Sequence, residues 1–516
     1  MSQSHDDKEL GTSGDLPIQE AVTPPATGHP KGLYWLFFAE MWERFCYYGM
    51  RALLVLYLTK TLMVADKETF AIYGAYTALV YAVTVFGGKL ADSLLGYRIA
   101  VIMGGFLMAI GEFMILGGNQ FWLLLGMAVI ISGNGYFKAN ISSIVGRLYA
   151  DGDPRRDSGF TIFYIGINLG AFLATTVVAE VGNKFGYEYG FALAGIGMVI
   201  GAIVFMFGQK HYEGHGLPPD REKLMRPFIG PLSRLHITIL GTIAIIPVFY
   251  MLLSNGPVVG ILLAVVAIVM LAVLLYEGFK GGVVLRDRMI ILILLMFFNI
   301  VFWACFEQAG SSLTLFADRN IDRVVFGYPI GAATTQFFNP FYILIFGSIF
   351  SIMWIRLSKI GKNPNIPMKF GLGIVQLGLG YLVVWLVSSM GFVSDEYTMP
   401  LFTLVFLYML HTTGELFLSP IGLSMVTKLA PKKMTGMVMG AWFLSIAGAN
   451  YVAAILAQLT GTEEHGGGGE EVAASAQQTL TQYIDIYTQM GLITVGIGMV
   501  LVILSKPLNK LMHGVR

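Results

Sequence analysis

Long apolar stretches recur along almost the whole sequence. Each stretch reaches about 20 residues, the length that an α-helix needs to cross the hydrocarbon core of a bilayer. Of all residues, 55% are hydrophobic and only 13% are charged, against about a quarter charged in ordinary soluble domains. The stretches lie at residues 32–60, 68–91, 97–117, 121–146, 159–184, 189–209, 235–254, 257–277, 289–317, 334–357, 367–391, 398–427, 434–459 and 480–505. A chain of this kind cannot cover itself with polar surface, so we expect an all-α polytopic membrane protein.

The apolar stretches fall into groups of about six, two and six. Residues 32–210 hold the first six, and the polar, Gly- and Pro-containing segment 211–234 is typical of a linker. Two more stretches at 235–279 form an inserted hairpin, and residues 280–516 hold the last six. Residues 1–31 are polar and acidic without the pattern of a cleaved signal peptide, which predicts a disordered cytoplasmic tail. The sequence therefore predicts two six-helix bundles plus two inserted helices, about 14 transmembrane helices in all.

The basic residues of the short loops predict the orientation of the chain. With a cytoplasmic N-terminus, most loop lysines and arginines fall on the cytoplasmic side. The opposite side keeps only a few, namely Lys60, Lys67, Lys184, Arg319 and Arg323. The positive-inside rule then places both termini in the cytoplasm.

The loop after the second stretch carries a recognisable motif. It reads GKLADSLLGYR from Gly88 to Arg98 and resembles the G-x-L-A-D-x-x-x-G-x-R loop of the major facilitator superfamily. Two six-helix halves joined by a cytoplasmic linker are also the layout of that superfamily. The resemblance implies the major facilitator fold, with a substrate site near the bilayer midplane between the halves.

The first apolar stretch contains four charged residues, Glu40, Glu43, Arg44 and Arg51. A charge inside the bilayer costs about 2.5–3.5 kcal/mol on insertion scales and usually marks a transport pathway. Glu40 and Arg44 are helical neighbours at i and i+4, and Tyr48 and Arg51 continue nearly the same face. This face must contact water or protein rather than lipid. Ion pairs that only tie helices together are the alternative interpretation.

Three further ionisable residues lie inside later stretches. Lys138 lies about midway through the fourth stretch, Glu307 lies within FWACFEQAGSSL and Glu415 within HTTGELFLSPIGL. Neither glutamate has an opposite charge within helical reach on its own helix. We therefore expect both glutamates to face the pathway.

Two long motifs carry a more specific resemblance. Glu40-x-x-Glu43-Arg44-Phe45-x-Tyr47-Tyr48-Gly49 resembles the E-x-x-E-R-F-x-Y-Y-G signature of the proton-dependent oligopeptide transporter family, and Phe163-Tyr164-x-x-Ile167-Asn168-x-Gly170 resembles its second signature. Segments in the expected helices also resemble that family around Lys138, Trp303 to Gly310, Asn339-Pro340, Glu415 and Trp442. The resemblance covers the chain from about residue 32. The inserted hairpin is similar to the bacterial branch, which implies a bacterial inner membrane. Ala139 departs from the pattern, since family members commonly have proline there.

A peptide zwitterion needs a cationic and an anionic pole in its site. Arg51 and Lys138 suit the carboxylate, and Glu415 suits the ammonium, with Asn339 as an additional acceptor. The resemblance implies the same polarity. Side-chain pockets are expected to be lined by Tyr48, Tyr81, Tyr164, Asn168, Trp303 and Trp442. For each aromatic residue, ordinary helix packing is an equal alternative.

Proton coupling needs a carboxylate whose charge changes as the transporter moves. Glu307, facing Arg51 across the cavity, is the leading candidate. Glu40 and Glu43 form a second relay, in which Arg44 and Lys138 neutralise them in turn; the resemblance supports this role. The function predicted from the sequence is proton-coupled uptake of di- and tripeptides by alternating access.

Other classes of function fit the sequence less well. No P-loop and no H-E-x-x-H motif is present, so we expect no enzyme, no bound metal and no cofactor other than the coupling proton. A net charge of +1 gives no indication of a nucleic-acid partner. We expect a functional monomer in the lipid bilayer. The alternative is a transporter of nitrate or another small anion, which would not need the anionic pole of Glu415.

Overall fold

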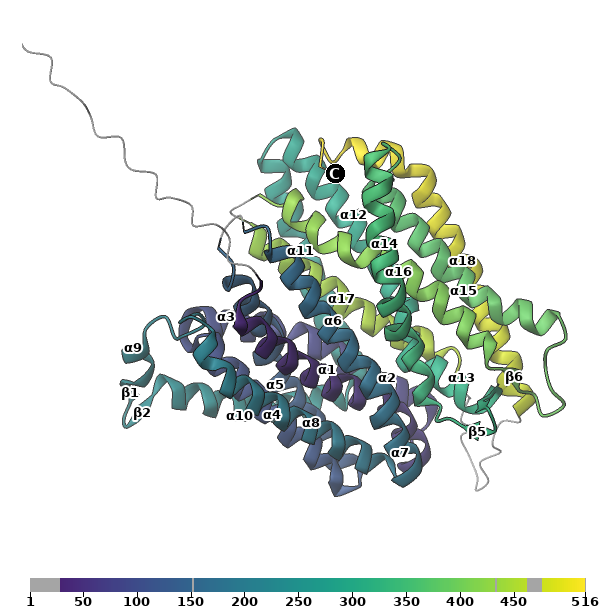
Figure 1. Ribbon diagram of the computed structural model, residues 1–516, viewed down its shortest axis with the longest axis horizontal. Coiled ribbons are helices and arrows are strands. Elements are labelled where there is room, and N and C mark those ends of the chain that lie inside the picture. Colours follow the sequence, from purple (N-terminus) through teal and green to yellow (C-terminus); the bar gives the residue numbers. More distant parts are fainter. Residues whose placement is uncertain (1–27, 151–152, 432–433, 462–475, 516) are drawn as a thin grey trace, which may run out of the picture.

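The computed structural model is helical almost throughout and describes residues 28–150, 153–431, 434–461 and 476–515 (Figure 1). Within these residues, thirteen helical segments are long and apolar enough to cross a membrane. The helix α1 (Lys31–Leu56) has the length as well but carries the four charged residues, and with it the number reaches fourteen. The predicted fold class is thus confirmed. Most of the predicted tail 1–31 and the acidic glycine-rich segment before the last helix lie outside the described residues.

The N-terminal half begins with α1, which continues into a π-helical turn, η1 (Tyr57–Thr61). Its other elements are α2 (Asp66–Ala82), α3 (Thr84–Leu90), η2 (Ala91–Leu95), α4 (Tyr97–Met114), η3 (Ile115–Gly117), α5 (Gln120–Arg147), α6 (Arg156–Leu173), η4 (Ala174–Val178), α7 (Ala179–Phe185), α8 (Tyr187–Gly208) and η5 (Gln209–His211). Glycines let these helices approach closely. A Cβ on Gly87, for example, would lie 1.9 Å from the backbone oxygen of Gly135.

The C-terminal half follows the same plan, and the two halves lie side by side (Figure 1). Its helical elements are α12 (Val283–Phe306), η6 (Glu307–Gly310), α13 (Ser312–Asn320), η7 (Ala333–Phe337), α14 (Phe338–Lys359), α15 (Ile366–Ser389), α16 (Phe402–Leu429), α17 (Thr435–Gln458) and α18 (Ala476–Lys510). Two-residue strands lie in its loops: β3 (Ile321–Asp322) pairs with β6 (Met399–Pro400), and β4 (Val324–Val325) pairs with β5 (Tyr328–Pro329). The apolar stretch at 289–317 is not one continuous helix, because a 3₁₀ turn beginning at Glu307 separates α12 from α13.

The halves meet along the helix pairs α2 with α17 and α6 with α14, and α1 and α7 add contacts with α13 and η7. Gly74 allows the closest approach in the first pair, since a Cβ there would lie 2.1 Å from the Cβ of Ala454. We call the end of the bundle where α1 finishes the outer end. The basic-residue pattern predicts that this end faces away from the cytoplasm.

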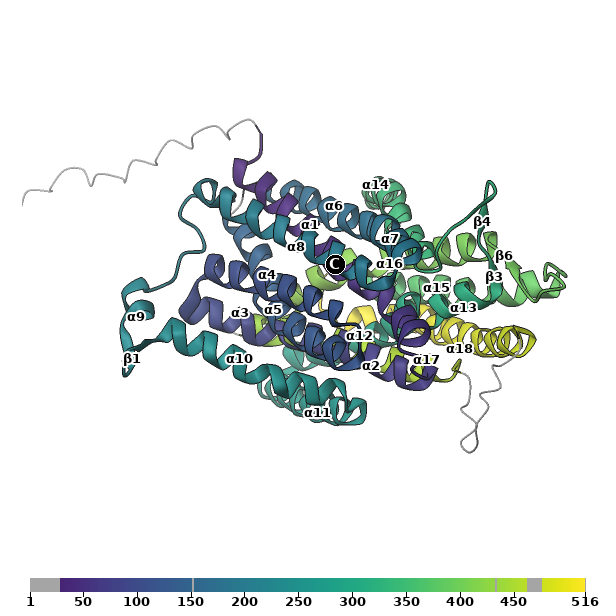
Figure 2. The ribbon, with the colours of Figure 1, turned by 90° about the horizontal axis from the view of Figure 1, so that it is seen from below.

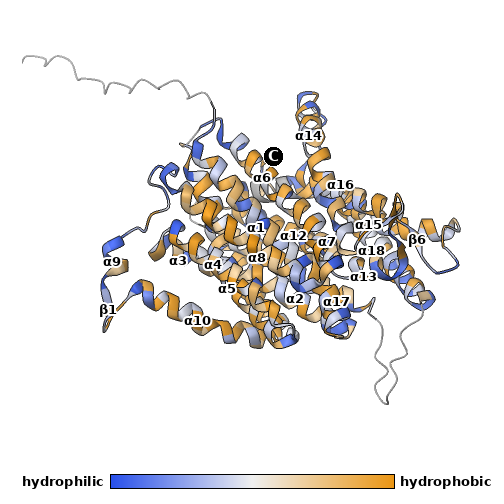
Figure 3. Ribbon diagram, turned by 60° about the horizontal axis from the view of Figure 1, so that its bottom comes forward, coloured by the Kyte–Doolittle hydropathy of each residue, from blue (hydrophilic) through white to orange (hydrophobic). Residues whose placement is uncertain are grey.

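The segment between the halves contains α9 (Arg221–Met225), β1 (Pro227–Ile229), β2 (Leu232–Ser233), α10 (Arg234–Leu253) and α11 (Gly256–Lys280). The linker at 211–234 is therefore not wholly irregular, as it includes one short helix and a two-stranded ribbon. Its residues are mostly hydrophilic around α9, whereas α10 is hydrophobic along most of its length (Figure 3).

The inserted hairpin lies at the edge of the molecule (Figure 2). In the most apolar window of each helix, only 6% of the residues of α10 and 11% of those of α11 are buried, so most of their surface is left for lipid. The two helices have different neighbours. Helix α10 packs on α5, where the Tyr136 and Thr242 hydroxyls are 2.8 Å apart, whereas α11 packs on α12 and α17 of the C-terminal half and also contacts α2 of the N-terminal half.

Replacing residues 235–279 by a flexible linker should leave dialanine uptake measurable. The physical reason is that none of the predicted site residues lies on the hairpin. Uptake by the inserted deletion variant, normalised to its amount in the membrane, checks this expectation. A correctly inserted variant with no transport at all would show that the bridge between the halves is essential.

Candidate functional site

The charged residues of α1 form one compact cluster. The Arg44 Nε atom lies 3.0 Å from Glu40 Oε1, and Arg44 is also ion-paired with Glu43. Asn134 of α5 donates to Glu43 Oε1 at 3.3 Å. All three charged side chains are buried, so a single guanidinium pairs with two carboxylates in a place from which water is largely excluded.

Lys138 lies next to this cluster but outside its ion pairs. Its ammonium lies 3.6 Å from the ring centre of Tyr81 and 5.6 Å from that of Tyr47. The structure describes no ion pair for it within the part of the chain that is placed, although Glu40, Glu43 and Glu307 lie within electrostatic range. The helix α5 runs through Ala139 without a break, so the departure there does not interrupt the helix.

Arg51 is held across the interface between the halves. It is ion-paired with Glu307 of η6, and its Nε donates to the Tyr73 hydroxyl at 2.6 Å. The helix break places Glu307 and Gly310 directly against α1 and α2. A Cβ on Gly310 would lie 1.9 Å from the Tyr73 oxygen, so glycine is needed for this contact.

Glu415 forms the acidic group of the C-terminal half. Asn339 Nδ2 donates to Glu415 Oε2 at 3.0 Å and lies 3.1 Å from Thr412 Oγ1. The Glu415 side chain is buried, and no basic partner is described for it in the placed residues. Asn339 therefore helps to orient the carboxylate, and the use of its own carbonyl as an acceptor for substrate stays a prediction.

Among the polar and aromatic residues predicted to line pockets, Tyr48, Tyr164 and Asn168 belong to the N-terminal half. Tyr48 lies within electrostatic range of Arg44, Arg51, Glu307 and Glu415. Tyr164 of α6 is 39% exposed and lies within electrostatic range of Tyr48 and Glu415. Asn168 is on the same helix and donates to the Tyr164 carbonyl at 3.0 Å.

The two tryptophans lie differently. Trp303 packs edge-on against Phe302 and Phe306 of its own helix, with ring centres 5.5 and 5.1 Å apart. Trp442 is buried against Phe370 and Gly422 in the C-terminal half. Both positions fit ordinary packing, and their predicted contact with substrate stays a prediction.

The outer end is closed by contacts between the halves. Lys60 Nζ lies 2.7 Å from Asp318 Oδ1, and Arg319 forms a two-pronged pair with Asp66 at 2.6 and 2.8 Å. Glu180 adds a third contact with the C-terminal half, described below. We call these contacts the outer gate. Together with the Arg51–Glu307 pair they hold the outer halves of the two bundles together.

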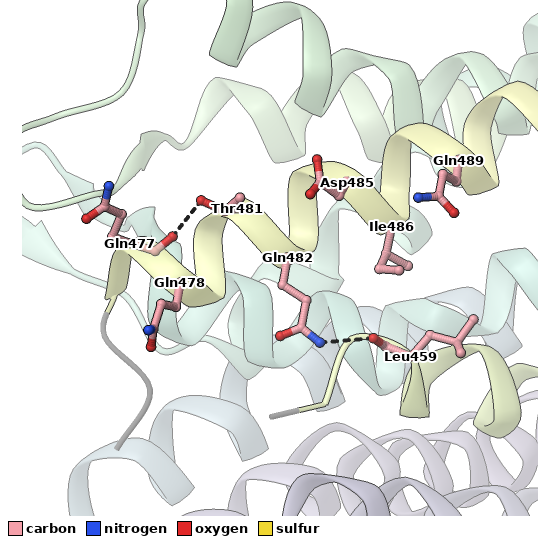
Figure 4. A pocket seen from close by; sticks show the side chains of 8 residues that line it. All are labelled: Leu459, Gln477, Gln478, Thr481, Gln482, Asp485, Ile486 and Gln489. Atoms are coloured by element: carbon pink, nitrogen blue, oxygen red, sulfur yellow. Dashed lines mark hydrogen bonds between the residues drawn. The ribbon is translucent and has the colours of Figure 1, made fainter. Parts of the chain in front are cut away.

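A surface hollow at the outer end of α18 is separate from this site. It is lined by Leu459 and by residues of α18, among them Gln482, which donates to the Leu459 carbonyl at 3.0 Å (Figure 4). None of its lining residues is a predicted site residue. Among the described residues, no group of His, Cys, Asp and Glu could hold a metal ion.

Several residues of the site were missed in the sequence. Tyr73, Asn134 and Thr412 all contact a predicted site residue, and Asn134 precedes Lys138 by one helical turn. That spacing could have identified Asn134. Tyr73 carries no such signal, because an apolar helix often contains tyrosine.

Comparison with known proteins places the chain in a family. The family model described as "POT family" matches residues 98–472. The chain belongs to the POT family. Dipeptide and tripeptide permease A of Erwinia pyrifoliae is 34% identical over 95% of this chain and 96% of its own length. Dipeptide and tripeptide permease B of Salmonella typhimurium is 30% identical over 94% of this chain and 96% of its own length.

Solved structures agree with the sequence comparison. A crystal structure of peptide transporter POT in complex with sulfate superposes with a TM-score of 0.80 at 34% identity, covering 95% of this chain and 97% of that one. A crystal structure of a mutant of peptide transporter POT in complex with alafosfalin gives a TM-score of 0.81 at the same identity and coverage. The POT fold therefore extends over nearly the whole chain, which is a multi-pass membrane protein.

Proposed function

We propose that this POT-family chain is a proton-coupled symporter that takes up di- and tripeptides by alternating access. One observation carries the proposal: the two halves present opposite charges to the space between them. Arg51 and Lys138 belong to the N-terminal half, and Glu415, which accepts a hydrogen bond from Asn339, belongs to the C-terminal half. A zwitterion with separated charges fits between such poles, and the permease names of the relatives support the same substrate class.

The relay on α1 supports the coupling to protons. In this state Arg44 is paired with both Glu40 and Glu43 while Lys138 lies over Tyr81. Two buried carboxylates and two nearby cations have more than one arrangement of pairs, and a proton changes which arrangement is favoured. We propose that protonation of the carboxylates and the movement of Lys138 between partners form one coupled step.

The Arg51–Glu307 pair supplies a link between proton binding and the gate. Protonation of Glu307 removes the charge that holds Arg51. Arg51 then becomes free for the peptide carboxylate, and an interhalf contact is lost at the same time. The proton thus favours both peptide binding and opening of the outer half. Transport of nitrate or another small anion is not favoured, because that substrate leaves the Glu415 pole without a partner.

We further propose that the protein lies in a bacterial inner membrane with both termini in the cytoplasm. The distribution of basic residues and the bacterial relatives support this placement. Both poles and the relay come from one chain, which supports function as a monomer.

Uptake of labelled dialanine into proteoliposomes tests the proposal directly. With an inside-negative potential of 100 mV, each coupled proton contributes about 2.3 kcal/mol. At about 1.36 kcal/mol per decade, one proton can accumulate the peptide about 50-fold. An uncoupler should reduce this ratio to about one. Accumulation that is insensitive to the proton gradient would rule out proton-coupled symport.

A further inference from the structure

Glu180 lies at the outer gate, away from the residues assigned to substrate or protons. It belongs to α7 of the N-terminal half, and its carboxylate reaches the segment that leads into η7 of the C-terminal half. Gly331 N–H donates to Glu180 Oε1 at 2.7 Å, and the Thr334 hydroxyl donates to the same oxygen at 2.6 Å. These donors are more than 150 residues away along the chain, so only the closed outer end brings them together.

We propose that Glu180 is a latch of the outer gate, a positioning residue that stabilises the closed outer end and must release η7 before the outer half opens. Hydrogen bonds to a carboxylate are about twice as strong as those between neutral groups. One of the two donors is a backbone N–H, which is fixed in place by the segment itself. The latch therefore holds the backbone of one half to a side chain of the other.

The surroundings of Glu180 are packed for this contact. An added Cβ on Gly331 would lie 3.2 Å from Asn183 Cβ and 3.1 Å from Thr334 Oγ1, so α7 lies directly on this segment. Lys184, one turn after Glu180, has its ammonium 4.9 Å from the ring centre of Tyr328. The latch thus lies on a different pair of elements from the ion pairs of η1 and α2 with α13. Outer opening must break both groups of contacts.

The inference rests on the alternating access of the proposed function, but its main test uses no transported substrate. Ala332 lies between the two donor residues and is 2% exposed. A cysteine placed there reports opening, because a membrane-impermeant maleimide added from outside can react only when η7 is uncovered. The native Cys46 and Cys305 are buried, and the parent chain without Ala332→Cys gives their background.

In the Ala332→Cys background, Glu180→Ala should raise the labelling rate about tenfold, because the open fraction rises as the closed state loses two hydrogen bonds to a charged acceptor. Glu180→Gln should stay within about threefold of the parent, since its amide oxygen can accept the same two bonds. Thr334→Val removes one donor and should give an intermediate increase if Glu180→Ala does not insert. Glu68→Ala is the matched control, as Glu68 accepts only from Gln120 of its own half at 3.3 Å among the described contacts. Equal labelling of the Glu180→Ala and Glu68→Ala proteins would overturn the latch.

A second experiment asks whether α7 must leave this segment at all. Asn183→Cys with Gly331→Cys places two Cβ atoms about 3.2 Å apart, close to the range of disulfides. Oxidation of this pair should stop dialanine exchange, and reduction should restore it. Undiminished exchange by the fully oxidised protein would show that η7 need not move away from α7. Loss of the maleimide effect would refute the latch alone, whereas absence of dialanine transport with an intact maleimide effect would refute the proposed substrate alone.

Discussion

Lys138→Ala is expected to abolish uphill accumulation of dialanine while leaving exchange of peptide across the membrane measurable. In the structure Arg44 is paired with both Glu40 and Glu43, and Lys138 is the second cation within range of them. The relay has two arrangements, in which the carboxylates of Glu40 and Glu43 pair either with Arg44 alone or with both Arg44 and Lys138. Without Lys138 only the first arrangement is left. Binding and release of a proton then no longer require a conformational change.

The measurement is the ratio of internal to external labelled dialanine in proteoliposomes at a potential of 100 mV. Wild type should approach about 50-fold for one coupled proton, and the variant should stay at about onefold. Lys369→Ala is a matched control, because Lys369 is also a buried lysine over an aromatic ring, with its ammonium 4.2 Å from the Trp354 ring centre, but on α15. Wild-type accumulation by the Lys138→Ala protein would refute the relay.

Glu415→Gln should weaken dialanine binding by about 30-fold or more. Truncation of a buried charge pair typically costs about 2–5 kcal/mol, and about 1.4 kcal/mol corresponds to tenfold in affinity. The glutamine can still accept the hydrogen bond from Asn339 that the structure shows at 3.0 Å, so the pocket keeps its shape and loses only the charge. N-acetyl-dialanine lacks the ammonium, so it should compete poorly with dialanine for binding to the wild-type protein.

Competition assays with dialanine and N-acetyl-dialanine, each on the wild-type and the Glu415→Gln protein, form a double-mutant cycle in which one change is made in the ligand. The disadvantage of the acetylated ligand should shrink in the Glu415→Gln protein, because the two changes remove one shared contact. Glu112→Gln is a suitable control, since Glu112 is a buried glutamate of α4 whose described side-chain bond is with Cys46 of the same half. Strictly additive losses would mean that Glu415 does not contact the amino terminus. Equal inhibition by both ligands on wild type would favour the small-anion transporter.

Much of the candidate site could be predicted because charges are rare in a bilayer. Arg51, Lys138, Glu307 and Glu415 stand out in apolar stretches whatever their partners are, since each is costly to insert without a function. The family motifs added the polar and aromatic residues around them. For Trp303 and Trp442 the same reasoning did not distinguish substrate contact from packing, because either role buries an aromatic ring.

The sequence by itself determined the membrane topology. Hydrophobicity is a property of each residue and the bilayer has a fixed thickness, so windows of about 20 residues predict spans close to those in the structure. The stretch at 97–117, for example, matches the helical segment Tyr97–Gly117. The distribution of basic residues predicted the orientation by an equally local rule.

Only the tertiary structure decided which groups meet. The contact of Arg51 with Tyr73, the hydrogen bond from Asn134 to Glu43 and the contact of Glu180 with Gly331 each join two different helices or segments. The placement of the hairpin, with α10 against α5 and α11 against α12, α17 and α2, is of the same kind. These contacts depend on how the helices pack and where they break. Packing is set by side chains that are distant in the chain, so no window of the sequence contains both partners.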